Sequence, residues 1–367
     1  MRVLVLNAGS SSLKTSVVGE PGDATVSRDE LQRPAQTGWS GALGDALGGA
    51  GRIEAIGHRV VHGGARHTGA MLISDTVVGE LEELRDLAPL HNGPALEVIS
   101  AAREAFPDLP QVACFDTAFH RTLPNVARTL AVPRRLQAKG VARYGFHGLS
   151  YAYVMDALAA SVGPQAAQGR LVLAHLGNGA SLTAVHRGRS VDTSMAFTPA
   201  AGIPMSTRAG DLDPGLVLFL ARTERMTAEA FHRMVNHESG LLGVSETSGD
   251  VRDLLARESS DSRAAEALAL FCYQVKKWIG AFAAALGGID CMVFTGGIGE
   301  HAAPIRERIC EGLGFLGIEI DGPRNAAQAP RISPDRGRVD VRIIATDEEI
   351  MIAKAVDRLL RSGVREA

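Results

Sequence analysis

One short pattern occurs twice in the chain, once in each half, and it constrains the fold more than any other feature. Residues 3–18 consist of an apolar run, a turn rich in Gly and Ser, and a second apolar run, and residues 171–185 have the same order. Aligning Ser12 with Ser181 superimposes run on run and turn on turn. Short apolar runs joined by such a turn are typical of a β-hairpin. A hairpin that recurs in each half predicts an internal duplication.

The rest of the chain alternates between predicted strands and helices. Apolar runs predict strands at 53–61, 112–115, 291–294 and 341–345. Periodicity predicts helices at 78–87, 95–105 and 264–286, and a further helix with Ile305, Ile309 and Leu313 on one face. A last helix is expected after Thr346, which fits a capping box with Glu349. Residues 20–50 are expected to be a polar surface excursion, and the alternation as a whole predicts an α/β fold of two domains.

Composition and charge exclude several classes of protein. The 38 basic and 41 acidic side chains leave a net charge of −3, so no basic field is expected to attract nucleic acid or anionic lipid. The four cysteines are far apart in the sequence and predict reduced core thiols rather than a zinc ribbon or a disulfide framework. The first apolar run is too short for a signal peptide, and the stretch 279–289 is far below the ~20 residues that span a bilayer. We therefore expect a cytoplasmic protein without membrane or nucleic-acid partners.

Two known motifs for nucleotide binding can be tested on the sequence. The P-loop is absent, because the Lys14–Thr15 pair has Leu13 where the motif requires Gly. Residues 297–302 fit G-x-G-x-x-A after a predicted strand, which is typical of dinucleotide sites. That match lies late in the chain, with little sequence left for half of a Rossmann domain. A nicotinamide-dependent dehydrogenase is therefore the less favoured alternative.

The glycine turns favour a polyphosphate ligand instead. Backbone N–H groups and hydroxyls in the turns at 7–12 and 177–181 can cradle phosphate oxygens, and Lys14 adds a positive charge beside the first turn. A third turn, at 296–300, opens a helix, where a nucleoside can lie close to the backbone. Each turn alone is also compatible with a plain hairpin. The three together in an α/β chain predict a nucleotide site.

Three cationic or polar side chains are flanked by Gly or other small residues, which suits contact with a closely approaching ligand. They are Arg59, His147 and Arg208. A lone Arg or His is more often structural, but phosphoryl transfer needs positive groups around the equatorial oxygens and a metal on the bridging ones. Oxygen donors that suit Mg²⁺ or its waters are available at Asn7, Asp116 and Glu348.

These stretches together resemble the acetate kinase family, the acetokinase branch of the superfamily of actin-like sugar kinases and Hsp70. The matching segments, in the family's order, are LVLNAGSSSLK (4–14), GHRVVHGG (57–64), LAPLHN (87–92), FDTAFH (115–120), RYGFHGLS (143–150), AHLGNGASLTAV (174–185), DTSMAFTP (192–199), TRAGDLDPG (207–215), SGLLGVS (239–245), FTGGIGE (294–300) and ATDEE (345–349). The resemblance runs from residue 3 to about residue 356, and the motifs taken together are highly specific.

The resemblance implies the reaction ATP + acetate ⇌ ADP + acetyl phosphate, dependent on Mg²⁺, for which Mn²⁺ can substitute. It also implies a duplicated actin-like, ribonuclease H-like core, with a cleft between the two domains, and a homodimer. Domain I would comprise residues 1–117 with the C-terminal helix at 349–367, and domain II would comprise residues 118–348.

The resemblance also implies roles for individual residues. The metal-associated residues are expected to be Asn7 and Glu348. The catalytic group is expected to comprise Arg59, Asp116, His147 and Arg208. The acyl substrate is expected to contact Arg59, Val61, Leu90, Phe146 and Pro199. The nucleotide is expected to contact Ser10, Ser12, Lys14, His175, Leu176, Gly177, Asn178, Gly179, Asp250, Val251, Arg252, Gly297, Ile298, Gly299, Glu300 and His301.

Three positions depart from the family's pattern without removing a proposed catalytic group. Ser206 stands where Gly is common, and we expect it to crowd or slightly reorient Arg208. His301 replaces a common Asn, which bears on nucleotide affinity. Asp347 replaces Asn before Glu348, which bears on the charge near the metal. The segment 20–50 is also shorter than is usual in the family.

The expected chemistry is an in-line attack of the acetate carboxylate on the γ-phosphorus. Arg59 and Arg208 would neutralise charge on the phosphoryl group, and His147 would donate to an equatorial oxygen. A carboxylate nucleophile carries no proton at neutral pH and needs no general base. We therefore predict that Asp116 orients an arginine or holds a metal-bound water. Val61 favours acetate, while a propionate kinase of the same chemistry and an actin-like ATPase without an acyl acceptor remain alternatives.

Overall fold

A computed structural model describes residues 1–8, 12–19, 25–32, 39, 43, 52–85 and 89–362, with the side chains of 25–28, 32 and 89–91 left out. The chain divides into two compact units. Unit 1 comprises Met1–Arg121, Phe146–Tyr153 and Asp347–Ala367, and unit 2 comprises Thr122–Gly145 and Val154–Thr346. The expected domains had boundaries at 117/118 and 348/349, close to these, and did not place the segment 146–153 in the first domain.

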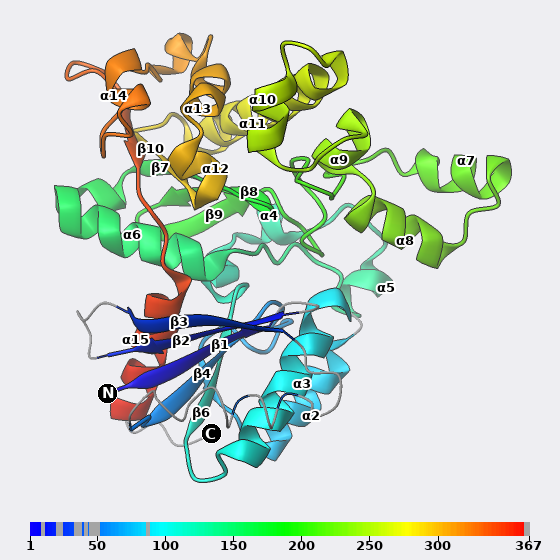
Figure 1. Cartoon of the computed structure of the whole chain (residues 1–367), viewed down its shortest axis with the longest axis vertical. Coiled ribbons are helices and arrows are strands. Elements are labelled where there is room, and N and C mark those ends of the chain that lie inside the picture. Colours follow the sequence, from blue (N-terminus) through cyan, green and yellow to red (C-terminus); the bar gives the residue numbers. More distant parts are fainter. Residues whose placement is uncertain are drawn as a thin grey trace. The chain divides into compact units, whose positions relative to one another are not determined.

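Unit 1 is built on a six-stranded sheet with the order β3-β2-β1-β4-β6-β5 (Figure 1). Its strands are β1 (Val3–Ala8), β2 (Ser12–Val18), β3 (Thr25–Gln32), β4 (Ala55–Val60), β5 (Met71–Leu72) and β6 (Gln111–Phe115). Its helices are α2 (Asp75–Glu83), α3 (Pro89–Ala105), the 3₁₀ turn η2 (Ala118–Thr122), the first residues of α6 (Gly148–Val162), and α15 (Glu348–Arg361).

Both faces of this sheet are covered, because successive side chains of a strand point to opposite faces. On β1, Val3 and Val5 pack in the cluster that contains the apolar side of α15, and Leu4 and Leu6 pack in the cluster that contains α3. Helix α15 lies very close to β4: a Cβ added at Gly57 would lie 2.5 Å from the Ile352 side chain. A strand with both faces buried reads as a continuous apolar run, which is how β1 was predicted.

Unit 2 contains a five-stranded sheet with the order β11-β10-β7-β8-β9. Its strands are β7 (Arg170–Leu176), β8 (Ala180–His186), β9 (Arg189–Thr193), β10 (Cys291–Thr295) and β11 (Asp340–Ile343). Its helices are α4 (Asn125–Arg128), α5 (Arg134–Gln137), the remainder of α6, η3 (Ala166–Gln168), α7 (Gly215–Thr223), α8 (Ala228–His237), α9 (Gly240–Ser245), α10 (Val251–Arg257), α11 (Ser262–Leu286), α12 (Gly296–His301), α13 (Ala303–Cys310), η4 (Gly314–Leu316) and α14 (Gly322–Ala326).

The two sheets have the same construction, which confirms the predicted duplication. In unit 1, β2 is antiparallel to both of its neighbours, β1 and β3, and β4 and β6 continue parallel to β1. In unit 2, β8 is antiparallel to both of its neighbours, β7 and β9, and β10 and β11 continue parallel to β7. The two hairpins predicted from sequence are β1–β2 and β7–β8. The predicted α/β, two-domain actin-like fold is thereby supported by the arrangement of its strands.

Several sequence-based expectations were wrong in detail. The surface excursion at 20–50 contains the strand β3, which pairs with β2, and two buried side chains, Trp39 and Leu43. The last helix is capped not by Thr346 but by Asp347, whose carboxylate accepts the N–H of Ile350 at 3.0 Å. The predicted helix with one apolar face is two short helices, α12 and α13, and ends before Leu313.

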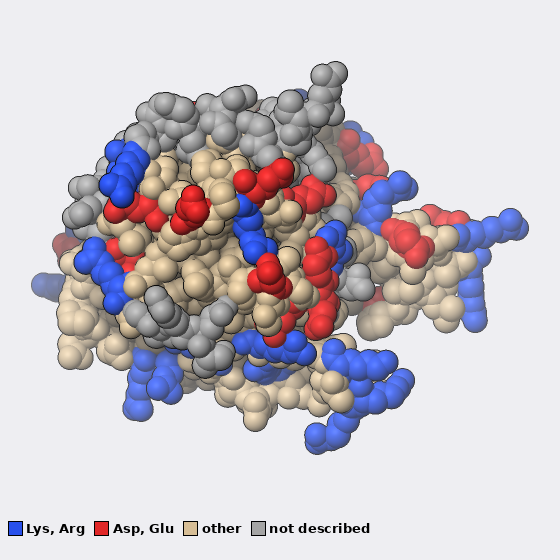
Figure 2. Space-filling model, turned by 90° about the horizontal axis from the view of Figure 1, so that it is seen from below, with Lys and Arg blue, Asp and Glu red and all other residues tan. Residues whose placement is uncertain are grey.

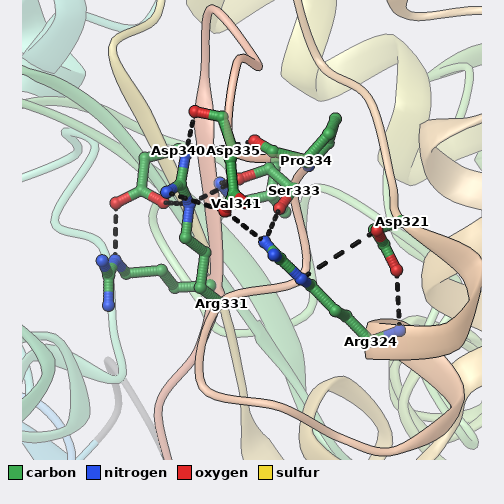
Figure 3. A network of polar contacts seen from close by, with 9 residues as sticks. Asp321, Arg324, Arg331, Ser333, Pro334, Asp335, Asp340 and Val341 are labelled. Atoms are coloured by element: carbon green, nitrogen blue, oxygen red, sulfur yellow. Dashed lines mark hydrogen bonds and ion pairs between the residues drawn. The ribbon is translucent and has the colours of Figure 1, made fainter.

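The outer edge of β11 is covered by a network of ion pairs (Figure 3). Arg331 Nε lies 3.0 Å from an oxygen of Asp340, and Arg324 Nη1 lies 2.8 Å from an oxygen of Asp335. The hydroxyl of Ser333 accepts the N–H of Val341 at 3.1 Å. Charged side chains and a covering loop are common protections for an edge strand, whose unpaired N–H and C=O groups would otherwise be available to another chain.

The surface carries charges of both signs. On the face shown in Figure 2, acidic and basic side chains lie among one another, as the near balance of 38 basic and 41 acidic residues leads one to expect. Within the described residues, none of the helices combines the length and the apolar character needed to cross a membrane.

Candidate active site

Arg59 is the centre of a cluster of polar side chains in unit 1. It lies in β4, and Asp116 directly follows the neighbouring parallel strand β6, so both project from the same edge of the sheet. Arg59 donates to the Asp116 carboxylate from Nε at 3.1 Å and from Nη2 at 2.7 Å. Its Nη1 lies 3.3 Å from Oδ1 of Asn7 and 3.3 Å from Oε2 of Glu348. The structure thus brings together four residues predicted from sequence, contributed by β1, β4, the end of β6 and the start of α15.

Electrostatics hold this arginine permanently charged. Asp116 is 1% exposed, so its two hydrogen bonds to Arg59 are shielded from water. Burial lowers the pKa of Arg59, but the negative charges of Asp116 and Glu348 outweigh it and raise that pKa above its ordinary value. One guanidinium against two carboxylates leaves a net negative charge in the cluster at neutral pH. A further cation is therefore favoured beside it.

The donors of the cluster fit a magnesium ion better than a softer metal. Among the residues that the structure describes, no group of three or more His, Cys, Asp or Glu side chains is placed to hold a metal. Mg²⁺, however, is typically bound by one or two carboxylates together with waters and substrate phosphates. Asn7 and Glu348 offer such oxygen donors, both within hydrogen-bond or ion-pair distance of Arg59.

The backbone around His147 is tied to Asp116. The N–H of Gly148, the first residue of α6, donates to the Asp116 carbonyl at 2.9 Å, and a Cβ at Gly148 would collide with that carbonyl oxygen. His147 itself has a left-handed backbone conformation, with φ of 58°, which is uncommon outside Gly, Asn and Asp and occurs at functional sites. The geometry fixes the position of His147 next to the chain segment that carries Asp116.

His120 is a supporting residue for which the sequence offered no distinguishing signal. Its Nε2 lies 3.0 Å from the carbonyl oxygen of Phe146, the residue before His147, and donates to it. Burial lowers the pKa of His120 to about 4, so its ring is neutral at physiological pH. His58 directly precedes Arg59 in the sequence, but its Nε2 lies 2.9 Å from Oε1 of Gln111 in the core, and burial lowers its pKa to about 4 as well.

The expected acyl contacts fall in both units. Phe146 is 1% exposed and meets the ring of His62 edge to face, with 5.4 Å between the ring centroids. Val61 follows β4 and is partly exposed, and Leu90 belongs to α3 with its side chain outside the described set. Pro199 belongs to unit 2, where its carbonyl accepts Nη1 of Arg208 at 3.3 Å.

Unit 2 contains a cavity of about 580 Å³, a size typical of sites for small ligands. It is lined by eight of the residues predicted to contact the nucleotide: Gly177, Asn178, Asp250, Val251, Arg252, Gly297, Ile298 and His301. Four further lining residues were not predicted as nucleotide contacts: Ser206, Leu255, Ala302 and Pro304. The cavity therefore combines glycine turns with an apolar wall.

Among the four lining residues that were not predicted as nucleotide contacts, Ser206 alone had been singled out in the sequence, because Gly is common at its position. Its hydroxyl lies 3.3 Å from Oδ1 of Asn178, and its N–H donates to the Asn178 carbonyl at 3.2 Å. A Cβ added at Gly249 would lie 2.7 Å from the Ser206 carbonyl oxygen. Ser206, which was expected to crowd or slightly reorient Arg208, lies in the wall of the cavity.

Other predicted nucleotide residues do not line the cavity. Leu176 and Gly299 are buried, and His175 and Gly179 belong to the β7–β8 hairpin.

The Glu300 carboxylate accepts the N–H of Gly296 at 2.8 Å and that of Thr346 at 3.2 Å. Glu300 thus holds the start of α12 and the chain segment that leads to α15.

A buried arginine holds the other end of the same helix. Arg306 is 0% exposed, and its Nη1 donates to the carbonyl oxygens of Gly299 and Glu300, each at 2.9 Å. Burial lowers its pKa to about 10, which still leaves it charged at neutral pH. Side-chain hydrogen bonds therefore hold the glycine turn at both ends of α12.

The first glycine turn lies mostly outside the described residues, which include neither Gly9, Ser10 nor Ser11. Ser12 and Lys14 belong to β2 in unit 1. Ser12 donates its hydroxyl to Glu30 at 2.7 Å, and Lys14 is exposed opposite Asn7 in the β1–β2 pairing.

Comparisons with known proteins point in one direction. A model of the acetokinase family matches residues 47–354. A curated acetate kinase from Rhodopseudomonas palustris is 49% identical over 314 residues, which cover 85% of this chain and 78% of that protein. One from Clostridium botulinum is 40% identical over 389 aligned positions, which cover 96% and 98%.

Solved structures agree with the sequence relatives. An acetate kinase of Porphyromonas gingivalis superimposes with a TM-score of 0.90 at 35% identity and covers 98% of this chain and 99% of its own. A propionate kinase of Francisella tularensis superimposes with a TM-score of 0.91 at 34% identity, covering 96% and 98%.

Proposed function

The chain belongs to the acetokinase family, and we propose that it transfers the γ-phosphoryl group of ATP to acetate in one reversible in-line step, giving ADP and acetyl phosphate. Acetate kinase activity follows from the family and from relatives at 40% and 49% identity. The observation that carries the mechanism is the clamp of Asp116 on Arg59, in a cluster where no general base is needed.

The proposed step is a direct displacement at phosphorus. A carboxylate oxygen of acetate forms the new P–O bond, and the bond from the γ-phosphorus to the bridging oxygen breaks, so the electron pair leaves with ADP. The carboxylate has no proton to lose at neutral pH. Both oxygens of Asp116 are engaged by Arg59 at 3.1 and 2.7 Å. Asp116 therefore acts as a positioning residue that orients the guanidinium.

We assign charge stabilisation to three side chains. Arg59 binds the acetate carboxylate and then faces the equatorial oxygens of the phosphoryl group, as His147 does by hydrogen bonding. Arg208 contributes a second guanidinium from unit 2. Such groups act most strongly where the charge is spread in the transition state rather than in the bound substrates. The left-handed backbone of His147 and its tie to the Asp116 segment support this assignment.

The family uses ATP or ADP and typically a divalent metal, and we propose Mg²⁺, with Mn²⁺ as a substitute. Asn7 and Glu348 would hold it, directly or through waters. When bound, the ion neutralises phosphate oxygens. The net negative charge of the Arg59 cluster supports the choice of site, and the oxygen donors support the choice of a hard cation.

The nucleotide belongs, in this proposal, to the cavity of unit 2. Leu255, Ile298 and Pro304 form apolar surface for the base, and the glycines at 177 and 297 let the backbone approach the ribose and phosphates. Glu300 and Arg306 keep α12 in place from its two ends. In this proposal the glycine turns of unit 2 bind the nucleotide, while the charged side chains around Arg59 in unit 1 stabilise the phosphoryl group during transfer.

We also propose that the chain forms a homodimer in the cytoplasm. Three apolar residues of α7, Val217, Leu218 and Phe219, are 47%, 54% and 59% exposed, and α7 projects with α8 from the body of unit 2 (Figure 1). An exposed apolar group of this kind is typical of a surface that is covered by another chain. The four cysteines are buried thiols, as expected in a reducing compartment. Phe219→Glu should convert the dimer to a monomer in sedimentation analysis, and an unchanged mass would exclude α7 as the interface.

The test of the function is the formation of acyl phosphate from ATP, Mg²⁺ and a carboxylic acid, trapped as the hydroxamate. Acetate should give the highest kcat/KM. Propionate should be poorer by roughly ten- to 200-fold, because one methylene is worth about 1–3 kcal/mol in a fitted pocket. ADP release without any hydroxamate would show a bare ATPase and would contradict the proposal, and propionate leading acetate would show a propionate kinase instead.

A further inference from the structure

Unit 1 contains a second cavity, of about 460 Å³, which the proposed reaction does not use. Neither the Arg59 cluster nor the expected acyl contacts line it. Its inner wall is apolar: Phe115 of β6 is 1% exposed and Leu149 of α6 is 8% exposed. Cys114 lines it as well, and burial raises the pKa of its thiol to about 12, so this side chain stays neutral. The interior therefore suits a hydrocarbon group.

Two arginines lie on the solvent side of this cavity. Arg121 of η2 and Arg358 of α15 line it and are exposed. None of the described lining residues is acidic. The acid next to Arg358 in sequence, Asp357, is already engaged by Arg361 at 2.8 Å and by the N-terminal amine of Met1 at 3.8 Å. Among the described residues, the charged side chains that line this apolar cavity are both positive, which is complementary to a molecule with a hydrocarbon tail and an anionic head.

We propose that this cavity is a second ligand site, which binds a medium-chain carboxylate with its tail between β6, α6 and α15 and its head at Arg121 and Arg358. The volume lies within the range of about 300–1,000 Å³ that is typical of sites for small molecules. The two guanidiniums select a carboxylate over an alcohol or an amine of the same length. The site is separate from the acyl contacts at Arg59, since the two sets of residues do not overlap.

The ligand also regulates turnover, because the cavity lies directly behind catalytic candidates. Phe115 immediately precedes Asp116 in the chain, and Gly148 immediately follows His147. Helix α15, which supplies four of the lining residues, begins at Glu348. A tail between these three segments fixes their spacing and so lowers kcat without competing with acetate. This second part rests on the proposed function, whereas the binding itself does not.

The binding is tested by calorimetric titration of the full chain with octanoate, with octylamine and octanol as probes of equal length and different charge. Octanoate should bind one equivalent, and the other two probes should bind at least tenfold more weakly. Arg358→Gln should weaken octanoate at least tenfold, while Arg85→Gln, a change of an exposed arginine of unit 1 outside the cavity, should not. Arg59→Lys should leave octanoate affinity within twofold, because the acyl site is not the site measured.

Filling the cavity gives an independent variant. Ala152→Phe should abolish octanoate binding while the thermal midpoint stays within a few degrees, and if that variant unfolds, Arg358→Gln alone still decides. Equal affinity for octanoate and octanol, or a loss of octanoate binding in Arg59→Lys but not in Arg358→Gln, would overturn the site.

In the acyl phosphate assay, octanoate should lower kcat at least twofold with the KM for acetate unchanged. Inhibition by octanoate that is purely competitive with acetate would overturn the proposed regulation. An absence of all acyl phosphate would instead count against the proposed function.

Discussion

The two units use related sheets for different kinds of site. Unit 1 places charged side chains at the carboxyl ends of its strands and locks them together, as in the clamp of Asp116 on Arg59. Unit 2 presents glycine turns, an apolar wall and a helix held from both ends by Glu300 and Arg306. The same sheet topology thus supports either charged side chains held in a fixed orientation or glycine turns that let a ligand come close to the backbone. Changes in unit 1 should mainly alter kcat, and changes in the cavity of unit 2 should mainly alter the KM for ATP.

Arg208 provides the strongest challenge to this division, because it is a charged residue of unit 2 with a proposed role in the transition state. Arg208→Ala should lower kcat by about 10³-fold, since its contact would be made mainly in the transition state. The matched control is Arg252→Ala, an exposed arginine that lines the cavity and pairs with Asp250. Steady-state kinetics should show kcat within about twofold for the control. An unchanged kcat in Arg208→Ala would remove it from the reaction.

Acid should weaken unit 1 through its buried histidines. His58 and His120 have pKa values lowered to about 4 by burial, whereas an unfolded histidine titrates near 6.5. Between these values the unfolded chain binds more protons, so stability falls as pH drops from about 6.5 to about 4, by roughly 3 kcal/mol per histidine at most. Thermal midpoints measured from pH 7 to pH 4.5 should fall, and His58→Gln should flatten that dependence. A midpoint independent of pH in the wild-type chain would contradict the assignment.

Gly148 tests whether the position of His147 matters. Gly148→Ala would push a Cβ against the Asp116 carbonyl, which moves the turn that carries His147, and kcat should fall about 10²-fold with the KM for ATP little changed. Gly79→Ala in α2 is the matched control, since nothing lies within 4 Å of an added Cβ there. If Gly148→Ala retained both activity and stability, the hydrogen bond from Gly148 to Asp116 would not position the site.

A change at Leu255 is expected to have the smallest effect on the kinetics, and to alter the KM for ATP rather than kcat. Leu255→Ala removes apolar surface from the cavity wall, worth about 1–2 kcal/mol, so the KM for ATP should rise five- to thirtyfold while kcat stays within twofold. Val126→Ala, at a residue that is 87% exposed and outside the cavity, should change neither. A fall in kcat without a change in KM would place Leu255 outside the nucleotide site.

Much of the fold could be predicted because its signals are local. The hairpins β1–β2 and β7–β8 follow from apolar runs around glycine turns, and the carboxyl ends of β4 and β6 bring Arg59 and Asp116 to one edge of the sheet. The strand β3 was missed because it lies at an edge and carries charged residues such as Arg28 and Asp29, which hide its alternation. The helix cap was misassigned because Thr346 and Asp347 are both good capping residues, and only the backbone decides between them.

The hydrogen-bond partners of individual side chains could be predicted less well than the helices and strands on which those side chains lie. Glu300 lies in a glycine motif that favours a nucleotide, yet its carboxylate is used by the N–H groups of Gly296 and Thr346. Leu255 and Pro304 carry no polar signal that could mark them as part of a site. Tertiary packing determines which apolar residues line a cavity, and no short pattern in the sequence reports it.

The most direct test of the division between the units is the affinity of Arg59→Ala for ADP, measured by calorimetry. Arg59 is proposed to act in the reaction from unit 1, so its loss should lower kcat by about 10³-fold or more while leaving the Kd for ADP within twofold of the wild-type value. A Kd for ADP that is weaker by tenfold or more would show that the nucleotide depends on unit 1. That result would contradict the claim that the charged cluster reacts and the cavity of unit 2 binds.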